Sequence, residues 1–253
     1  MFIFGCFGTE LLLYPSNVSK RYILQYKRST MKTEQENNNQ LRRPKFLSDK
    51  QAHKIDDHIE KTIGKTGLVY HEIMSDLIHV DIYKIDPTKE RNYYTLVTVG
   101  MSALPMKTPN KKYSPYLELM ISLPHTWKLE EKDLEDENNY WPIRKLKETA
   151  RFPFMYGTWL GVGHSIPNGN PPEQFSDNCP YTGIILLPSL LHPRSWTCKI
   201  SPFKKIDFLA IHPLYTSEMD YKVEQGMSSF FDTFSEHNVS EIVDIERKDI
   251  TRT

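Results

Sequence analysis

The sequence predicts an α+β protein with a mixed, largely antiparallel sheet covered by helices. Amphipathic helical patterns lie near the start, in the middle and near the end of the patterned region, with short apolar runs between them. The links between the early apolar runs are short and polar, for example residues 86–92. Links of this length join antiparallel strands, whereas parallel strands need a longer crossover. About 200 residues can form one core, so we expect one domain over residues 41–238.

The first and last helices are predicted from their apolar faces. Ser48 and Gln51 form a capping-box pattern that begins the first helix, and Gly64 or Gly67 ends it. The last helix begins near Ser217 and carries apolar residues at helical spacing.

The middle helix is predicted to begin after Asn138 or Asn139 and to end before Phe152. Asn138 or Asn139 caps it, and Pro142 falls in its first turn, where a missing N–H costs little. Pro153 disfavours helical geometry at the preceding residue, so we expect the helix to end there.

Apolar runs predict seven strands. The later runs are continuously apolar, which indicates burial on both faces of the sheet. The predicted strands are residues 68–74, 77–85, 93–99, 116–123, 183–188, 196–200 and 206–211.

Both ends of the chain differ from this pattern. Residues 1–40 are expected to be a disordered or over-called extension, with Met31 as an alternative start, because residues 31–40 are almost entirely polar. The apolar stretch before them is too short to span a bilayer, although an amphipathic surface anchor stays open. Residues 239–253 alternate in charge, so we expect a weakly ordered tail.

The charge balance and the cysteines restrict the function. Lys and Arg number 32, as do Asp and Glu, so no overall field attracts nucleic acid or an anionic membrane. Cys6, Cys179 and Cys198 are odd in number and far apart, which fits reduced thiols in the cytoplasm.

Residues 157–169 have the most unusual local composition in the chain. Several glycines lie among aromatic and polar side chains, and residues 167–169 form a Pro-Asn-Gly turn. Loops held by rigid elements often carry binding residues. The candidate partner-binding residues lie in this loop and just before it; they are Phe152, Tyr156, Trp159, Gly163, His164 and Asn168. In the alternative interpretation, Trp159 fills the core and the glycines only make turns.

Motifs for catalysis, metals and cofactors do not appear. The chain has no GxSxG elbow, no complete dinucleotide loop and no GxxxxGK[ST] phosphate loop. His53 with Asp57 and His79 with Asp81 supply two ligands each, which is short of a zinc set. We therefore expect no catalytic residue, no metal and no cofactor.

Four segments carry a resemblance to a known family. They are WPIRKLKETARFPFMYGTWLGVGHSIPNG at 141–169, HVDIY at 79–83 with YYTLVTVGMSALPM at 93–106, YLELMISLP at 116–124, and IDFLAIHPLYTSEMDYKVEQG at 206–226. In this order they resemble the suppressor-of-fused domain family, in its short single-domain bacterial form, from about residue 46 to residue 234.

The resemblance implies a cytoplasmic binding protein. Animal members grip a short extended peptide of a zinc-finger transcription factor, and many bacterial members are implied to be immunity proteins that neutralise toxins. Phe152 falls where animal members have an aromatic residue near the peptide groove, and His164 where they have an acidic residue that receives the peptide. We therefore expect a non-enzymatic module, an immunity protein, that binds a protein or peptide partner such as a toxin domain. The alternative is a hydrolase-like enzyme that uses His164 with Asp81 or Glu118.

Overall fold

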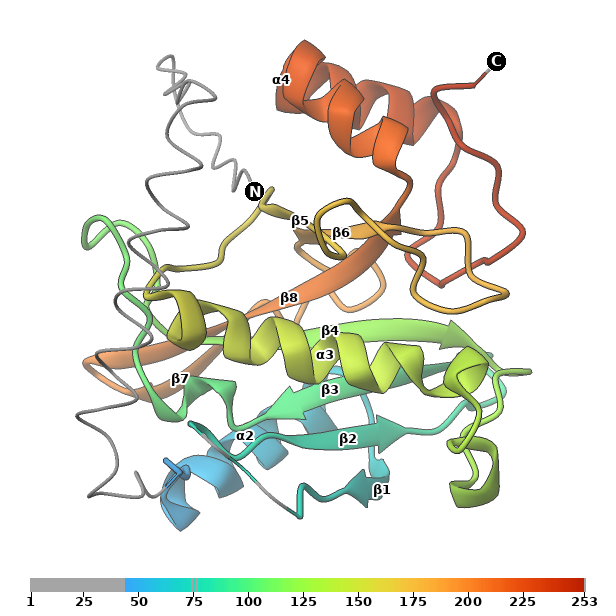
Figure 1. The fold of residues 1–253 in the computed structure, drawn as a ribbon. Helices are drawn as coiled ribbons and strands as arrows, with labels where there is room; N and C mark the ends of the chain where they lie inside the picture. Colours follow the sequence, from blue (N-terminus) through green and yellow to red (C-terminus); the bar gives the residue numbers. More distant parts are fainter. Residues whose placement is uncertain (1–43, 74, 76, 253) are drawn as a thin grey trace, which may run out of the picture.

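An eight-stranded sheet separates two helical layers (Figure 1). The structure, a computed structural model, describes residues 44–73, 75 and 77–252, so the predicted extension over residues 1–40 lies outside the described residues. Helix α3 (Glu137–Tyr156) packs on one face of the sheet. Helices α2 (Asp49–Thr62) and α4 (Thr216–Glu236) pack on the other. The predicted α+β class with a mixed sheet is confirmed.

The strand order is β1-β2-β3-β4-β8-β6-β5, and β7 pairs with β8 outside this path. Strands β4 and β8 run parallel, with Leu117 opposite Asp207, and the other named pairings are antiparallel. The strands are β1 (Thr66–Tyr70), β2 (Asp81–Ile85), β3 (Tyr93–Val99), β4 (Leu117–Pro124), β5 (Ser165–Pro167), β6 (Gly183–Leu187), β7 (Thr197–Ser201) and β8 (Lys204–Leu214). Two short 3-10 turns, η1 (Met101–Ala103) and η2 (Glu131–Asp133), complete the elements.

Strand β4 shows why the central runs are continuously apolar. Successive side chains of a strand point to opposite faces. Leu119 and Ile121 therefore pack in the cluster under α3, while Met120 packs in the cluster under α2. All three are fully buried, so neither face of β4 needs polar side chains.

Glu118 is the charged residue within β4, and its carboxylate is fully buried. It accepts hydrogen bonds from the Thr98 hydroxyl at 2.6 Å and from the backbone N–H groups of Gly100 and Ser102 at 3.0 and 2.9 Å. Burial raises the pKa of Glu118, and these donors oppose that rise. Gly100 has φ +133°, and a Cβ there would lie 2.0 Å from the His79 carbonyl oxygen. Glu118 thus fixes the turn after β3, in which only glycine fits at residue 100.

The predicted boundaries of the middle helix were wrong at both ends. Asp136 caps α3 by accepting a hydrogen bond from the Asn138 N–H at 2.9 Å, so the helix begins earlier than expected. At its other end α3 continues through Pro153 to Tyr156. Burial of Phe152 and Pro153 against the rest of the protein compensates for the bond that a proline cannot donate. Gly157, in the left-handed conformation with φ +61°, ends the helix instead.

The C-terminal segment, residues 239–252, packs against the domain and differs from the weakly ordered tail that the sequence predicted. The Val243 N–H donates to the Ser122 carbonyl at 2.9 Å, beside an isolated parallel bridge to β4. Val243 and Ile250 are buried. Alternating charge was an unreliable sign of disorder here, because part of this charge lies in buried ion pairs.

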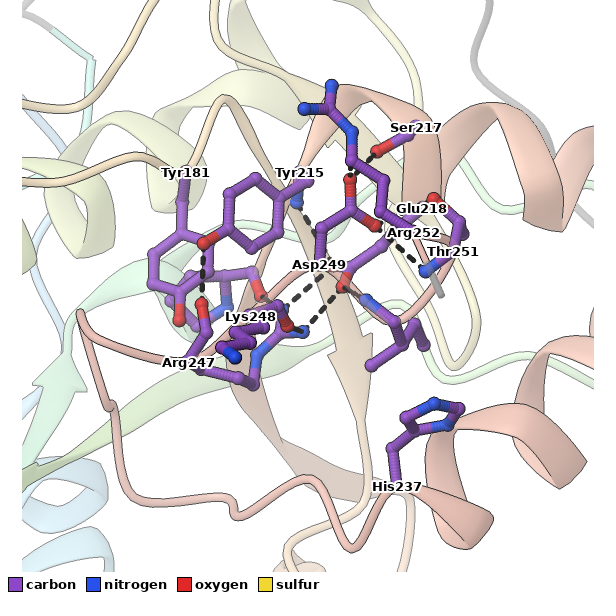
Figure 2. Close-up of polar contacts among 12 residues, drawn as sticks. Tyr181, Tyr215, Ser217, Glu218, His237, Arg247, Lys248, Asp249, Thr251 and Arg252 are labelled. Atoms are coloured by element: carbon purple, nitrogen blue, oxygen red, sulfur yellow. Dashed lines mark hydrogen bonds and ion pairs between the residues drawn. The ribbon is translucent and has the colours of Figure 1, made fainter.

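Arg247 holds this segment to the start of α4 (Figure 2). Its guanidinium contacts both carboxylate oxygens of Glu218, at 2.5 and 2.8 Å, and Glu218 is fully buried. Glu218 also accepts from the backbone N–H groups of Tyr215 and Ile250. A two-pronged pair of this kind fixes geometry as well as charge.

Removing Arg247 is expected to destabilise the protein strongly. Arg247→Ala leaves the Glu218 carboxylate buried without its cation, which costs roughly 3–5 kcal/mol in unfolding free energy. Urea unfolding measures it. Arg252→Ala is the matched control, because Arg252 is 82% exposed and its partner Asp249 keeps its other donors, from Ser217 and Thr251, so its loss is expected to cost less than about 1 kcal/mol. Equal losses for the two variants would contradict a special role for the buried pair.

Candidate partner-binding site

The loop after α3 lies against a second loop, residues 104–116, that precedes β4. The Lys107 N–H donates to the Thr158 carbonyl at 3.3 Å, and the Leu160 N–H points to the Met106 sulfur at 3.4 Å. The two loops therefore form one continuous surface at the end of the sheet where α3 finishes (Figure 1).

Two aromatic pairs follow each other along the predicted site. The rings of Phe152 and Tyr156 lie 4.7 Å apart between centroids, on the last turns of α3. Trp159 contacts Tyr113 and His164, each at 4.4 Å between ring centroids. Phe152 is buried, whereas Tyr156 is 47% exposed. Tyr156 is thus the predicted residue that offers most aromatic surface to a partner.

Trp159 is partly buried and packs against the main core. Both interpretations drawn from the sequence therefore apply to Trp159: part of its indole packs in the core, and part is exposed to solvent. The ring also explains Gly161, where a Cβ would lie 2.7 Å from the indole. Gly163 has φ +81°, and a Cβ there would meet the Met227 side chain of α4 at 3.0 Å. These two glycines allow close packing and do not by themselves mark a binding surface.

His164 is only 2% exposed, and neither ring nitrogen has a hydrogen-bond partner among the described residues. Burial, reinforced by the nearby Lys222 ammonium and opposed by the Trp159 carbonyl, lowers the pKa of His164 to about 4. The imidazole is neutral at neutral pH. Direct contact between His164 and a partner, which the sequence predicted, does not fit this burial; the residue lies in the layer behind the surface.

Asn168 is occupied within the protein. Its side-chain oxygen accepts from the Lys145 ammonium of α3, and its amide nitrogen donates to the Glu173 and Gln174 carbonyls at 2.8 and 3.1 Å. These bonds close the turn at residues 168–174. Asn168 follows β5 and so lies about 13 Å along the chain from His164. The structure therefore separates Asn168 from the aromatic pairs.

Strand β5 forms one end of the path of described strands, next to β6. Leu186 donates to the His164 carbonyl at 3.0 Å, and the Asn168 N–H donates to the Thr182 carbonyl at 2.8 Å. In an antiparallel ladder the backbone groups between such positions alternate in direction. Ser165 and Pro167 therefore turn their carbonyls, and Ser165 its N–H, away from β6, although Ser165 is itself buried and only Ile166 and Pro167 of this strand are partly exposed.

The residues of the hydrolase alternative do not meet. Asp81 contacts His71 and His79 at 3.1 and 3.0 Å, and Glu118 is enclosed by its own donors. The nearest arrangement of catalytic type is the Lys222 ammonium 3.0 Å from the Ser165 hydroxyl, with both residues 4% exposed. A substrate cannot reach a pair this deep without rearrangement.

In the part of the chain that the structure describes, no group of three His, Cys, Asp or Glu residues could hold a metal. No helix in this same part is long and apolar enough to cross a bilayer.

Sequence reasoning missed two contributors to this region. Tyr113 contacts Trp159 from the loop before β4, and Lys222 reaches Ser165 from α4. Both come from segments far away in the chain, and neither belongs to a local motif. Only the sheet topology brings them to the loop after α3.

Comparisons with known proteins agree on one family and one fold. Residues 76–248 match the family model described as "Suppressor of fused protein (SUFU)". A SUFU homolog from Neisseria gonorrhoeae FA 1090 aligns with a TM-score of 0.60 and 13% identity, covering 80% of this chain and 98% of its own. A structure described as the Sufu-Fu complex aligns with a TM-score of 0.56 and 15% identity, covering 82% and 93%.

Drosophila Suppressor of Fused aligns with a TM-score of 0.52 and 14% identity, covering 78% of this chain and 50% of the Drosophila chain. No match was found among the curated proteins. At these identities the solved structures establish the fold.

Three buried histidines predict acid-sensitive stability. Burial is the first cause that lowers the pKa of His164, His192 and His212 to about 4. In an unfolded chain these groups titrate near 6.5. The unfolded state therefore binds more protons between about pH 6.5 and pH 4, and the unfolding free energy falls as the pH decreases through this window. Urea unfolding between pH 7.5 and pH 4.5 measures the fall.

His164→Phe separates the contribution of one histidine. It keeps a ring of similar size and removes the two unpartnered nitrogens, so the fall in unfolding free energy between pH 7.5 and pH 4.5 is expected to shrink by about 2–3 kcal/mol. His53→Phe, at an exposed position of α2, serves as control and is expected to leave the pH dependence unchanged. An unaltered pH dependence in His164→Phe would show that this imidazole is solvated or paired.

Proposed function

Because the chain belongs to the suppressor of fused family, as the match over residues 76–248 shows, we propose that it is a non-enzymatic protein-binding module. The observation that carries this proposal is the exposed ring of Tyr156 at the end of α3, on the loop surface that leads to the edge strand β5. An extended segment of a partner can add to such an edge through main-chain hydrogen bonds. Neighbouring side-chain pockets then supply specificity.

The site has residues that can contact such a segment and residues that support them. Tyr156 and the outer part of Trp159 supply aromatic contact area, which is typical of residues that dominate binding energy. Phe152 supports Tyr156 from below. Gly163 and His164 shape the strand that leads into β5, and Asn168 fixes its far end.

We further propose that the partner is a toxin domain and that the chain is an immunity protein acting in the cytoplasm. Two features support this extension. The homolog from Neisseria gonorrhoeae is covered over 98% of its length, so a domain of this size exists as a whole chain elsewhere in the family. The described cysteines, Cys179 and Cys198, are free and buried, as in proteins of a reducing compartment.

A growth-rescue experiment tests the proposal. The product of the adjacent reading frame is expressed in a bacterial host with and without this chain, and the chain is expected to restore growth. Tyr156→Asp is expected to weaken binding by about 1–3 kcal/mol and to lower rescue, because it replaces aromatic contact area by charge.

Leu68→Asp is the matched control. Leu68 lies on β1, at the opposite edge of the sheet, and is 47% exposed, as is Tyr156. Equal rescue by the two variants would place the interface elsewhere. An adjacent frame that encodes a metabolic enzyme, with no effect on growth, would contradict the immunity function while leaving peptide binding to be measured directly.

A further inference from the structure

Positive charge gathers at one end of this electrically neutral chain. Three segments meet there: the loop 104–116, the β7–β8 hairpin at 197–206, and the end of α3 with the first part of its following loop at 149–162. None of the three contains an Asp or a Glu. Their exposed lysines are Lys107, Lys111, Lys112, Lys199 and Lys205.

Direct contacts hold these segments together. The Lys204 ammonium donates to the Ser102 carbonyl at 3.0 Å and lies 4.1 Å from the centre of the Tyr116 ring. Ser114 donates to the Lys205 carbonyl at 3.4 Å. On the other side, Lys107 bonds the loop after α3 through its backbone. The lysines therefore share one surface, which we call the basic end.

Carboxylates on the neighbouring strands do little to offset this charge at the surface. Glu118 lies beneath the basic end, fully buried and engaged with its own donors. Asp207 accepts from the Thr197 hydroxyl at 3.1 Å and is partly exposed, so it sets one negative charge against five exposed lysines. A surface field from several lysines thus remains, and it reaches about 8–10 Å at moderate ionic strength.

Apolar side chains are exposed among these lysines. Phe203, at the hairpin tip, is 99% exposed, and Met155 and Tyr156 at the end of α3 are 57% and 47% exposed. Single exposed apolar residues are common, but apolar anchors within a charged surface are typical of protein interfaces.

We infer that the basic end binds an acidic segment of the protein partner, one in which Asp or Glu alternates with apolar residues. The inference rests on the proposed binding function and adds the charge of the partner. Lysines attract the carboxylates, while Phe203, Met155 and Tyr156 contact the apolar residues. The edge strand β5 follows directly from the same loop, so one extended chain that leaves the basic end can reach the partly exposed residues of β5.

A polynucleotide fits this surface less well. The aromatic rings nearest the lysines, Tyr113 and Trp159, pack on each other and so are not both available as stacking platforms for bases. These three segments also have no exposed arginine among their described residues. Arginine is the preferred two-pronged ligand of phosphate, so its absence disfavours binding of a polynucleotide backbone.

Selection from a random 12-residue peptide library tests the inference with three proteins. They are the wild type, the basic-end variant Lys107→Glu/Lys111→Glu/Lys112→Glu, and a control variant Lys50→Glu/Lys65→Glu/Lys89→Glu with the same change in net charge at exposed positions elsewhere. The wild type and the control are expected to enrich acidic peptides with interspersed apolar residues. Affinity for a selected peptide is expected to fall at least tenfold in the basic-end variant, to fall as NaCl rises from 50 to 300 mM, and to weaken in Phe203→Ser.

The outcomes separate the two proposals. Enrichment of neutral or basic peptides, unaffected by the basic-end variant, would overturn the acidic partner but keep the binding function. No enrichment by the wild type would overturn both. Tighter binding of the wild type to phosphatidylserine vesicles or to a 20-nucleotide poly(dT) than to any selected peptide, lost in the basic-end variant, would reassign the surface to a membrane or to nucleic acid.

Discussion

The parallel pairing of β4 with β8 is the contact on which the rest of the structure depends. It joins a four-stranded antiparallel unit, β1 to β4, to the second unit formed by β8, β6, β5 and β7. Parallel neighbours cannot be joined by a tight turn, so the chain between them must cross the sheet. That crossover contains α3, the loop after it and β5. The candidate site therefore exists because the two halves of the sheet are joined in parallel.

Buried carboxylates fix the loops around this sheet. Glu118 binds the turn after β3, and Glu218 binds Arg247 and the C-terminal segment. Glu241 accepts from the Ser189 hydroxyl and the Leu190 N–H at 2.5 and 2.7 Å and so connects that segment to the loop after β6. A buried charge is costly without donors. Each of the three has them, so these contacts order backbone that no strand or helix holds.

The sequence predicted what depends on periodicity and left out what depends on long-range contacts. Alternation and helical spacing located the helices and most strands, because burial on a face leaves a regular pattern. Pro153 was misread because a local rule expected the helix to stop, whereas packing of its last turn extends it. The C-terminal segment was misread because the partner of Arg247, Glu218, lies on another element.

The candidate site shows the same division. The loop after α3 could be identified from its composition, but burial within it could not, and the structure places Tyr156 at the surface and His164 behind it. A histidine between glycines carries no sign of its depth. The Trp159 ring packs on the His164 ring, and Met227 of α4 lies close to the adjacent Gly163. Exposure within a loop is decided by distant elements, so the list of candidate residues was more reliable than the role given to each.

The basic end follows from the same topology. Because β4 and β8 run parallel, both strands begin at the same end of the sheet, and the segments that precede them meet there. One of these is the loop 104–116 and the other is the β7–β8 hairpin, and each brings its own lysines. Helix α3 runs back across the sheet after β4, so its C-terminal end returns to this end as well (Figure 1). A chain with balanced charge thus acquires a basic surface at one end of its sheet, which net charge alone does not predict.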